Sequence, residues 1–309
     1  MLLSTPIVVD VLEALARAPR SLTDLRRQVG SPPQTTMRAH LRTLTETGVV
    51  TRIRRNEFPG SLDYELTISG RDLWATAEVV RAWLARAPDG PVRLGSTAAK
   101  SAIKALVEGW DTSMVRALAA RPLSLTELNT VIPSVSYPSL ERRLTAMRLA
   151  GQLEKASSRG PGTPYEVTDW LRRAIAPLAT AARWERLNVE SETASISRLD
   201  AEAAFLLAVP LLRPPPNLSG ACRLVVELPA GNGDRLCGVL VVVKQGRIAA
   251  CSTKLRAEAD AWVSGSAPVW LRTVIEQDFG RLEIGGDCRL SQSLLDGLHE
   301  ALFGDMQYA

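Results

Sequence analysis

The side chains best suited to binding a ligand lie along a predicted helix over residues 34–47. Met37, Leu41 and Leu44 recur at i, i+4 and i+7, which predicts a buried apolar face. The other face then carries groups that can bind base edges or phosphates: Gln34, Thr35, Thr36, Arg38 and Arg42. Arginine can donate twice to guanine, and glutamine can pair in the same way with adenine. The alternative is an ordinary polar face exposed to solvent. The elements around the helix help to decide between the two interpretations.

Those elements form an ordered set around the helix. They are a helix over 7–18, a helix beginning at Ser21, a turn at 30–33 and, after Gly48, two strands over 49–54 and 62–67. Three helices followed by a hairpin is the order of a winged helix, in which the helix over 34–47 can enter a major groove. In the wing, Arg54 and Arg55 suit contacts to phosphate or to the minor groove.

A near copy of this segment follows along the chain. The run ALAARPLSLTEL at 117–128 matches ALARAPRSLTDL at 14–25, and Gly151 matches Gly48 without a gap. The closing YEVT at 165–168 matches YELT at 64–67, and a trailing helix is predicted after each copy, over 71–87 and 169–187. One copy would predict a DNA-binding module, whereas two in tandem predict a built-in pseudo-dimer.

The second copy keeps the buried stripe and changes the outward face. Its candidate DNA contacts are Tyr137, Ser139, Arg142, Arg143, Lys155 and Arg159. Arg38 is replaced by Glu141, which repels phosphate but can accept from the amine of cytosine. Ala39 becomes Arg142, and Arg42 becomes Thr145. We therefore expect an asymmetric DNA site, or one unit that has been repurposed away from DNA.

Each copy resembles a winged helix of the HxlR/MarR kind. The resemblance spans about residues 6–188 and rests on residues that recur at fixed places: Leu41, Leu44, Gly48-Val49-Val50, Arg52, Tyr64-Glu65-Leu66-Thr67 and Gly70-Arg71 in the first copy, and Trp110, Leu144, Met147, Gly151 and Tyr165-Glu166-Val167-Thr168 in the second. It implies bacterial transcription regulation. HxlR-type proteins usually carry one such unit and dimerise, so the fusion departs from their pattern.

The last third of the chain differs in composition and predicts an α+β layer. The predicted elements are a helix in 191–212, strands over 221–228, 236–244, 247–252 and 258–263, a helix over 267–277, a short strand in 280–287 and a helix over 291–303. The basic excess lies in the repeated region, whereas this part is net acidic. We therefore predict a multidomain protein: two mainly-α winged-helix units, over 1–90 and 95–188, and an α+β domain over 195–309.

The tail contains ADAWVSGS at 259–266, an amphipathic helix directly after it, and GRLEIGGD at 280–287. On these segments it resembles the sterol carrier protein type-two-like fold. The resemblance implies an apolar tunnel between sheet and helices that holds a lipid-like or other hydrophobic small molecule. Candidate ligand contacts are Trp262 and Trp270, beside the implied tunnel, and Val241 and Val243, in a strand apolar at nearly every position. Ordinary packing is the alternative for these side chains.

The composition narrows the other classes of function. The four cysteines lie in the tail without metal-ligand spacing, so we expect buried reduced thiols and no metal or cofactor. No Ser/His/Asp set, phosphate loop or paired acid motif is found, so we expect no enzyme. No apolar run has the length of a membrane span and the start does not resemble a signal peptide, so we expect a cytoplasmic protein with no membrane partner.

Three functions stay open at this point. The first is a transcriptional regulator that binds double-stranded DNA with an affinity modulated by a hydrophobic or aromatic small molecule. The second is a self-resistance protein that binds a bioactive natural product or shields DNA from it. The third is a DNA-repair enzyme, which the missing acid/base set disfavours. The chain would act as a monomeric pseudo-dimer or as a homodimer.

Overall fold

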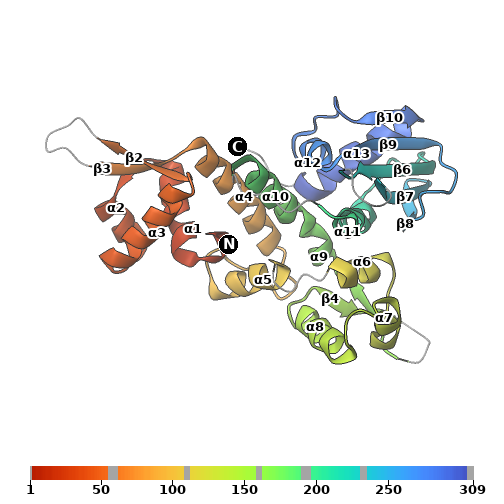
Figure 1. Ribbon diagram of the computed structural model, residues 1–309, viewed down its shortest axis with the longest axis horizontal. Coiled ribbons are helices and arrows are strands. Elements are labelled where there is room, and N and C mark those ends of the chain that lie inside the picture. Colours follow the sequence, from red (N-terminus) through yellow and green to blue (C-terminus); the bar gives the residue numbers. More distant parts are fainter. Residues whose placement is uncertain are drawn as a thin grey trace. The chain divides into compact units, whose positions relative to one another are not determined.

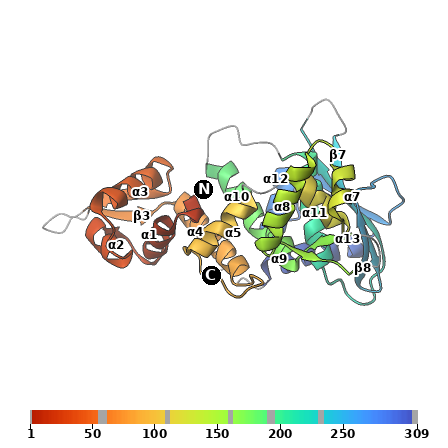
Figure 2. The ribbon, with the colours of Figure 1, turned by 90° about the horizontal axis from the view of Figure 1, so that it is seen from below.

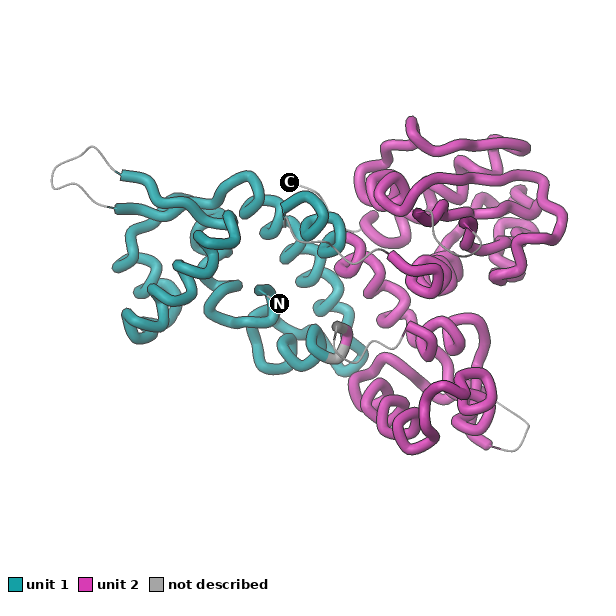
Figure 3. The backbone as a smooth tube through the Cα atoms, in the orientation of Figure 1, with its two compact units in different colours: residues 1–104, 180–193 teal, residues 105–179, 194–309 magenta. Residues whose placement is uncertain are grey.

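The computed structural model describes residues 2–54, 62–107, 112–157, 162–188, 196–229 and 235–304. The chain forms two compact units (Figure 3). Unit 1 comprises residues 1–104 and 180–193, and unit 2 comprises residues 105–179 and 194–309. The predicted division into three domains at 1–90, 95–188 and 195–309 stays a prediction.

Unit 1 contains the first repeat and the helices that follow it (Figure 1). Its elements are η1 (Leu2–Ser4), α1 (Pro6–Arg17), β1 (Arg20–Ser21), α2 (Leu22–Gln28), α3 (Gln34–Glu46), β2 (Val50–Arg54), β3 (Leu62–Leu66), α4 (Ile68–Leu84) and most of α5 (Thr97–Val107). The helices predicted over 7–18, from Ser21 and over 34–47 are confirmed, and so is the hairpin, whereas the trailing helix predicted over 71–87 covers 68–84. Strand β1 was not expected; it pairs with β3 and makes a three-stranded sheet in the order β1-β3-β2.

The apolar stripes of the sequence build the core of unit 1. Met37, Leu41 and Leu44 of α3 are all buried, and they pack with Leu12 of α1 and Leu25 of α2. Ser21 caps α2, because its hydroxyl accepts from the backbone N–H of Asp24. The chain leaves α3 at Gly48, whose φ of +69° is a left-handed conformation that favours glycine.

One core side chain of unit 1 comes from far along the sequence. Helix α10 (Ile175–Asn188) follows the second repeat, and its residues from 180 onward belong to unit 1. Trp184 of this helix is 8% exposed within the core cluster that holds Leu12 and Met37. Its indole Nε1 donates to the carbonyl of Ser69, at the start of α4, over 2.8 Å. The core of the first repeat is therefore completed by a later helix.

Unit 2 begins with the second repeat. Its elements are α6 (Thr112–Ala120), α7 (Leu125–Val131), α8 (Tyr137–Leu149), β4 (Leu153–Lys155), β5 (Tyr165–Val167), α9 (Asp169–Arg173) and the first part of α10. The prediction of one continuous trailing helix over 169–187 is wrong. Pro177 has no N–H to donate to the carbonyl of Arg173 and its ring crowds that carbonyl, so the helix breaks between α9 and α10.

Corresponding hydrogen bonds recur in the two repeats. Thr67 caps α4 and its Oγ1 donates to the carbonyl of Gly48; Thr168 caps α9 and donates to the carbonyl of Gly151. Gly151 has a φ of +70°, as Gly48 has +69°. Even the short contact of β1 recurs, since Leu123 forms a bridge with Tyr165 where Arg20 pairs with Tyr64. The repeat therefore extends from sequence to backbone geometry.

The rest of unit 2 is a five-stranded sheet with helices. The elements are α11 (Arg198–Ala208), η2 (Val209–Leu211), β6 (Gly220–Glu227), β7 (Leu236–Lys244), β8 (Arg247–Ser252), β9 (Ala261–Ser266), α12 (Ala267–Glu276), β10 (Glu283–Gly286) and α13 (Cys288–Phe303). The strand order is β10-β9-β6-β7-β8, and only β6 and β9 are parallel. Helices α11, α12 and α13 contact the sheet (Figure 2).

Three predicted boundaries in this region are wrong. Strand β9 begins at Ala261 rather than 258, because Asp260 uses its carboxylate to accept from the N–H of Ala221 before the strand starts. Helix α13 begins at Cys288 rather than 291, because Asp287 caps it. Helix α11 begins at Arg198, with Ser197 as its cap, whereas part of the predicted start lies outside the described residues.

The second repeat packs directly on the C-terminal region within unit 2. Helix α6 lies against α11, and Glu202 of α11 accepts from Arg116 of α6 and from Arg198 of its own helix. Arg172 of α9 donates to the carbonyl of Leu206 over 3.0 Å.

Among the described residues, no helix combines the length and apolar character that a membrane crossing requires.

Candidate nucleic-acid interface

The outward face of α3 is fixed by the burial of its inward face. With Met37, Leu41 and Leu44 in the core, the polar side chains named from the sequence are left at the surface. Gln34, Thr35, Arg38 and Arg42 are exposed, whereas Thr36 is half-buried. The helix starts after Pro33 without a side-chain cap, so its first backbone N–H groups have no such partner within the described residues.

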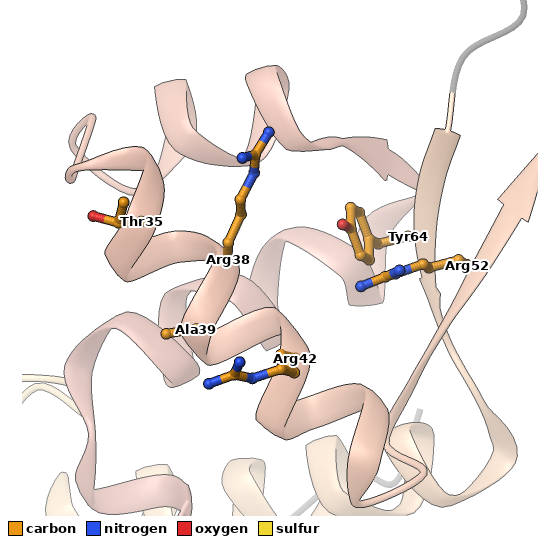
Figure 4. Close-up of a pocket in the computed structure, with 6 residues that line it drawn as sticks. All are labelled: Thr35, Arg38, Ala39, Arg42, Arg52 and Tyr64. Atoms are coloured by element: carbon orange, nitrogen blue, oxygen red, sulfur yellow. The ribbon is translucent and has the colours of Figure 1, made fainter.

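Helix α3 and the hairpin enclose an open groove of about 470 Å³. Six residues line it: Thr35, Arg38, Ala39 and Arg42 from α3, Arg52 from β2 and Tyr64 from β3. Figure 4 shows the Arg38 and Arg42 side chains leaving successive turns of the helix, and Arg52 lying beside the ring of Tyr64. Three guanidinium groups therefore serve one concave surface, which suits a polyanion.

Arg52 and Tyr64 form the hairpin side of the groove. They are partners in the strand register, and the Arg52 Cζ atom lies 5.8 Å from the centroid of the Tyr64 ring. This is cation–π geometry, and the buried Tyr64 ring gives the exposed arginine a fixed support. Neither residue was predicted as a site residue. The period of two in a strand was the available signal, since it puts Arg52 on the same face as Arg54.

The other predicted wing residues are placed differently. Arg54 is exposed at the end of β2, opposite Leu62, and does not line the groove. Arg55 lies outside the described residues, so its predicted contact with phosphate stays a prediction. Arg42 forms an ion pair with Glu46 on the next turn, at 3.8 Å and with both side chains mostly exposed. Such a pair is worth less than about 1 kcal/mol, so Arg42 can exchange it for another partner.

The second repeat presents a different set of side chains on α8. Leu140, Leu144 and Met147 are buried, as their counterparts in α3 are. Of the predicted contacts, Tyr137, Arg142 and Lys155 are exposed, Ser139 and Arg143 are half-buried, and Arg159 lies outside the described residues. Glu141 is exposed at the position of Arg38. The second repeat therefore presents an acidic group where the first presents a guanidinium.

Comparison with known protein families gives a match to the first repeat. Residues 7–89 match the family of the HxlR-like helix-turn-helix. The groove and all six of its lining residues lie inside this match. The second repeat and the C-terminal region lie outside it.

Two other comparisons give little. No curated protein matches the chain. Among solved structures, it is similar to a candidate transcriptional regulator, ytfH, from Salmonella typhimurium, with 24% sequence identity, a TM-score of 0.23 and coverage of 25% of this chain and 70% of that chain. We draw no conclusion from a similarity at this TM-score.

The four residues predicted to bind a hydrophobic ligand are split between the two faces of the sheet. Val241 is buried beside Cys222 and Ala261, and Val243 points to the same side of β7. Trp270 is buried in α12, where its ring meets that of Phe205 edge-on. Trp262 is the exception: it alternates with buried Ala261 and Val263, is 38% exposed, and lies over Gly285 on the other face. Ligand binding at these residues stays a prediction.

The cysteines divide into three shielded thiols and one exposed thiol. Burial raises the pKa of Cys222 and Cys251 to about 12 and that of Cys237 to about 11, so these thiols stay protonated and unreactive at neutral pH. The expectation of buried thiols is wrong for Cys288, which is exposed at the start of α13, and only partly met by Cys251, which is half-buried. Among the described residues, no three His, Cys, Asp or Glu side chains gather as a metal site would require.

Proposed function

We propose that this protein is a DNA-binding transcriptional regulator whose first repeat docks α3 into a major groove. The observation that supports this most directly is the groove of Arg38, Arg42 and Arg52 within the HxlR-like helix-turn-helix. In that motif the second helix is the one that enters the groove, and its outward residues meet base edges. Helix α3 holds that place and carries two arginines on its outward face.

We propose that residues 112–168 form a second winged helix. The support is the matching order of elements, the matching caps at Thr67 and Thr168, and the matching glycines after α3 and α8. The domain boundaries at 1–90, 95–188 and 195–309 belong to this proposal. Because Glu141 and Thr145 replace Arg38 and Arg42, the second unit binds DNA more weakly than the first or binds a different half-site.

We further propose that a hydrophobic small molecule modulates DNA affinity through the C-terminal region, a sterol-carrier-like layer. Its support is the apolar interior between the sheet and helices α11 to α13, to which Val241 and Trp270 contribute. A ligand can shift DNA affinity only if it binds one arrangement of the protein better than another. Quenching of tryptophan fluorescence by apolar probes tests binding directly.

The regulator proposal is tested by electrophoretic shifts on genomic fragments, including the DNA upstream of the protein's own gene. We expect one or a few fragments to bind at low protein concentration. Excess bulk DNA should displace the protein from these fragments only poorly. The double substitution R38A/R42A should abolish this preference, whereas R17A, on α1 and away from the groove, should keep it. Equal binding to every fragment would contradict a role as a regulator.

A further inference from the structure

We infer that the first repeat reads two guanines, about two base-pair steps apart, through Arg38 and Arg42, while Arg52 binds a backbone phosphate. This inference rests on the proposed DNA-binding function and assigns the chemical class of each contact within it. It follows from where the three guanidinium groups of the groove begin: two on a helix and one on a strand.

The spacing of Arg38 and Arg42 sets the spacing of the bases. Four helical residues rise about 6 Å, so the two side chains leave the same face of α3 one turn apart. Base pairs stack about 3.4 Å apart, so 6 Å corresponds to about two steps when the axis of α3 follows the stack. Guanine is the base that presents two acceptors, O6 and N7, to a guanidinium fork in the major groove. Two arginines at this spacing therefore match two guanines with one base pair between them.

The short residues beside the arginines in the groove leave the base edges accessible. Thr35 and Ala39 line the groove beside Arg38, and both are short. Neither can reach as far as an arginine, and their methyl groups offer an apolar contact for a thymine methyl. Among the described residues, Arg42 pairs with Glu46, and both of these side chains are mostly exposed. The two guanidinium groups therefore dominate what this face recognises.

Arg52 differs because it lies beside the helix rather than on it. An α-helix with its side chains is about 10–12 Å across, which fills a major groove about 12 Å wide. A side chain next to the helix then meets the wall of the groove, which is the phosphate backbone. The Tyr64 ring supports the Arg52 guanidinium from one side and leaves its N–H edges available to phosphate oxygens.

The second repeat lacks both arginines at the two corresponding positions. Glu141 stands at the place of Arg38, and a carboxylate only accepts hydrogen bonds, as guanine O6 and N7 do. Thr145 stands at the place of Arg42 and is too short to form a bidentate pair. Each bound chain should therefore read one guanine pair, through its first repeat.

The test is selection of bound DNA from a random pool by the full-length protein, followed by methylation interference with dimethyl sulfate, which modifies guanine N7. We expect one pair of guanines for each bound chain, about two steps apart, at which methylation prevents binding. R38A and R42A should each lose the preference for a different one of these guanines, by about 10- to 100-fold in discrimination. R38K, which keeps the charge but loses the fork, should lose it as well.

R52A should behave in another way. We expect it to weaken binding to all sequences by a similar factor and to reduce the slope of log affinity against log salt by about 1. R17A serves as the control, because it also removes one exposed arginine of unit 1 but lies outside the groove. It should change neither base preference nor the selected site.

The outcomes separate this inference from the proposed function. If no sequence is enriched from the pool, the regulator proposal itself fails. If a site is enriched but lacks guanine interference, or if R38A and R42A weaken all sequences alike, DNA binding stands and the guanine assignment is overturned. A loss of base preference in R52A would overturn its assignment to phosphate.

Discussion

At the residue scale, the two repeats differ at one buried position in a way that should affect stability. Val49 follows Gly48 in the first repeat, and Gln152 follows Gly151 in the second. Both occupy the same backbone site, since the N–H of each donates to a carbonyl of the preceding helix over 2.9 Å. Gln152 is only 2% exposed, and its Nε2 has no hydrogen-bond partner among the described residues. A buried amide donor without a partner costs free energy.

We therefore predict that Q152V raises the stability of unit 2 by about 1–2 kcal/mol, because it removes this unpaired donor. The reciprocal change is the control: V49Q puts an amide into the apolar core of the first repeat and should lower the stability of unit 1 by about 2–3 kcal/mol. Urea unfolding followed by circular dichroism measures both. A loss of stability in Q152V would show that the amide has a partner in solution.

The start of α7 carries a charge with a clear pH dependence. The backbone N–H of Ser124 and, next, the guanidinium of Arg121 donate to the carboxylate of Glu127, which lowers the Glu127 pKa from 4.5 to about 2. A lowered pKa means that the carboxylate stabilises the folded form above pH 4.5, and that this contribution is lost as the pH falls towards 2.

We expect E127Q to be less stable than the parent protein at pH 7, with the difference shrinking below pH 4.5 and vanishing near pH 2. Thermal unfolding across this range measures the difference, and an NMR titration of the Glu127 carboxyl gives the pKa directly. A stability difference that stayed constant between pH 7 and pH 2 would contradict the role of the charged carboxylate in this cap.

At the element scale, α10 connects regions that are distant in the sequence. Its first turns follow the second repeat in unit 2, and its last turns place Trp184 in the core of unit 1. A fragment that ends at residue 104 would lack this indole and its hydrogen bond to Ser69. The first repeat should therefore be less stable alone than within the full chain.

We predict that W184A lowers the stability of unit 1 by about 3–5 kcal/mol, since it leaves a large cavity in an apolar core. W184F keeps an aromatic ring in the core but loses the 2.8 Å hydrogen bond. The lost bond should cost about 1 kcal/mol, in addition to the cost of the smaller ring. W262A is the matched control, since Trp262 is a partly exposed tryptophan of unit 2. Hydrogen exchange of α1 and α3 gives the readout, and unchanged protection in W184A would contradict the assignment.

Elements with a sustained period were predictable from the sequence. Helix α3 has a buried residue on each turn, and strands β7 and β8 have apolar runs bounded by turns. Strand β1 has only two residues, too few to show a period, and it exists because β3 offers an edge. The break at Pro177 follows from the missing N–H of proline, a signal that was present in the sequence.

The candidate site was predictable on its helical side only. The outward face of α3 follows from the positions of Met37, Leu41 and Leu44 on the same helix. The contribution of Arg52 and Tyr64 depends on which residues face each other across β2 and β3, and that register is set by the turn between them as well as by the strands. Local periodicity does not report pairing between strands.

At the scale of the whole molecule, the second repeat and the C-terminal region behave as one unit. Glu202 is buried between α6 and α11, where both of its carboxylate oxygens are bonded to arginines. Thr112 donates to Asp200 over 2.8 Å, and Arg173 donates to the carbonyl of Ala301 over 3.2 Å. A conformational change of the C-terminal region can therefore reach the second repeat through these contacts.

The contact between α6 of the second repeat and α11 of the C-terminal region can be weakened selectively. We predict that E202A lowers the stability of unit 2 by about 2–3 kcal/mol, because Arg116 is left partly buried without its carboxylate. R198A removes the more exposed partner of the same carboxylate and should cost less than about 1 kcal/mol. Faster hydrogen exchange in both α6 and α11 of E202A would show that the pair holds the two regions together. If α6 exchanges as slowly as in the parent protein, apolar packing between α6 and α11 is enough to hold the two helices together. The carboxylate would then be unnecessary for coupling the C-terminal region to the second repeat.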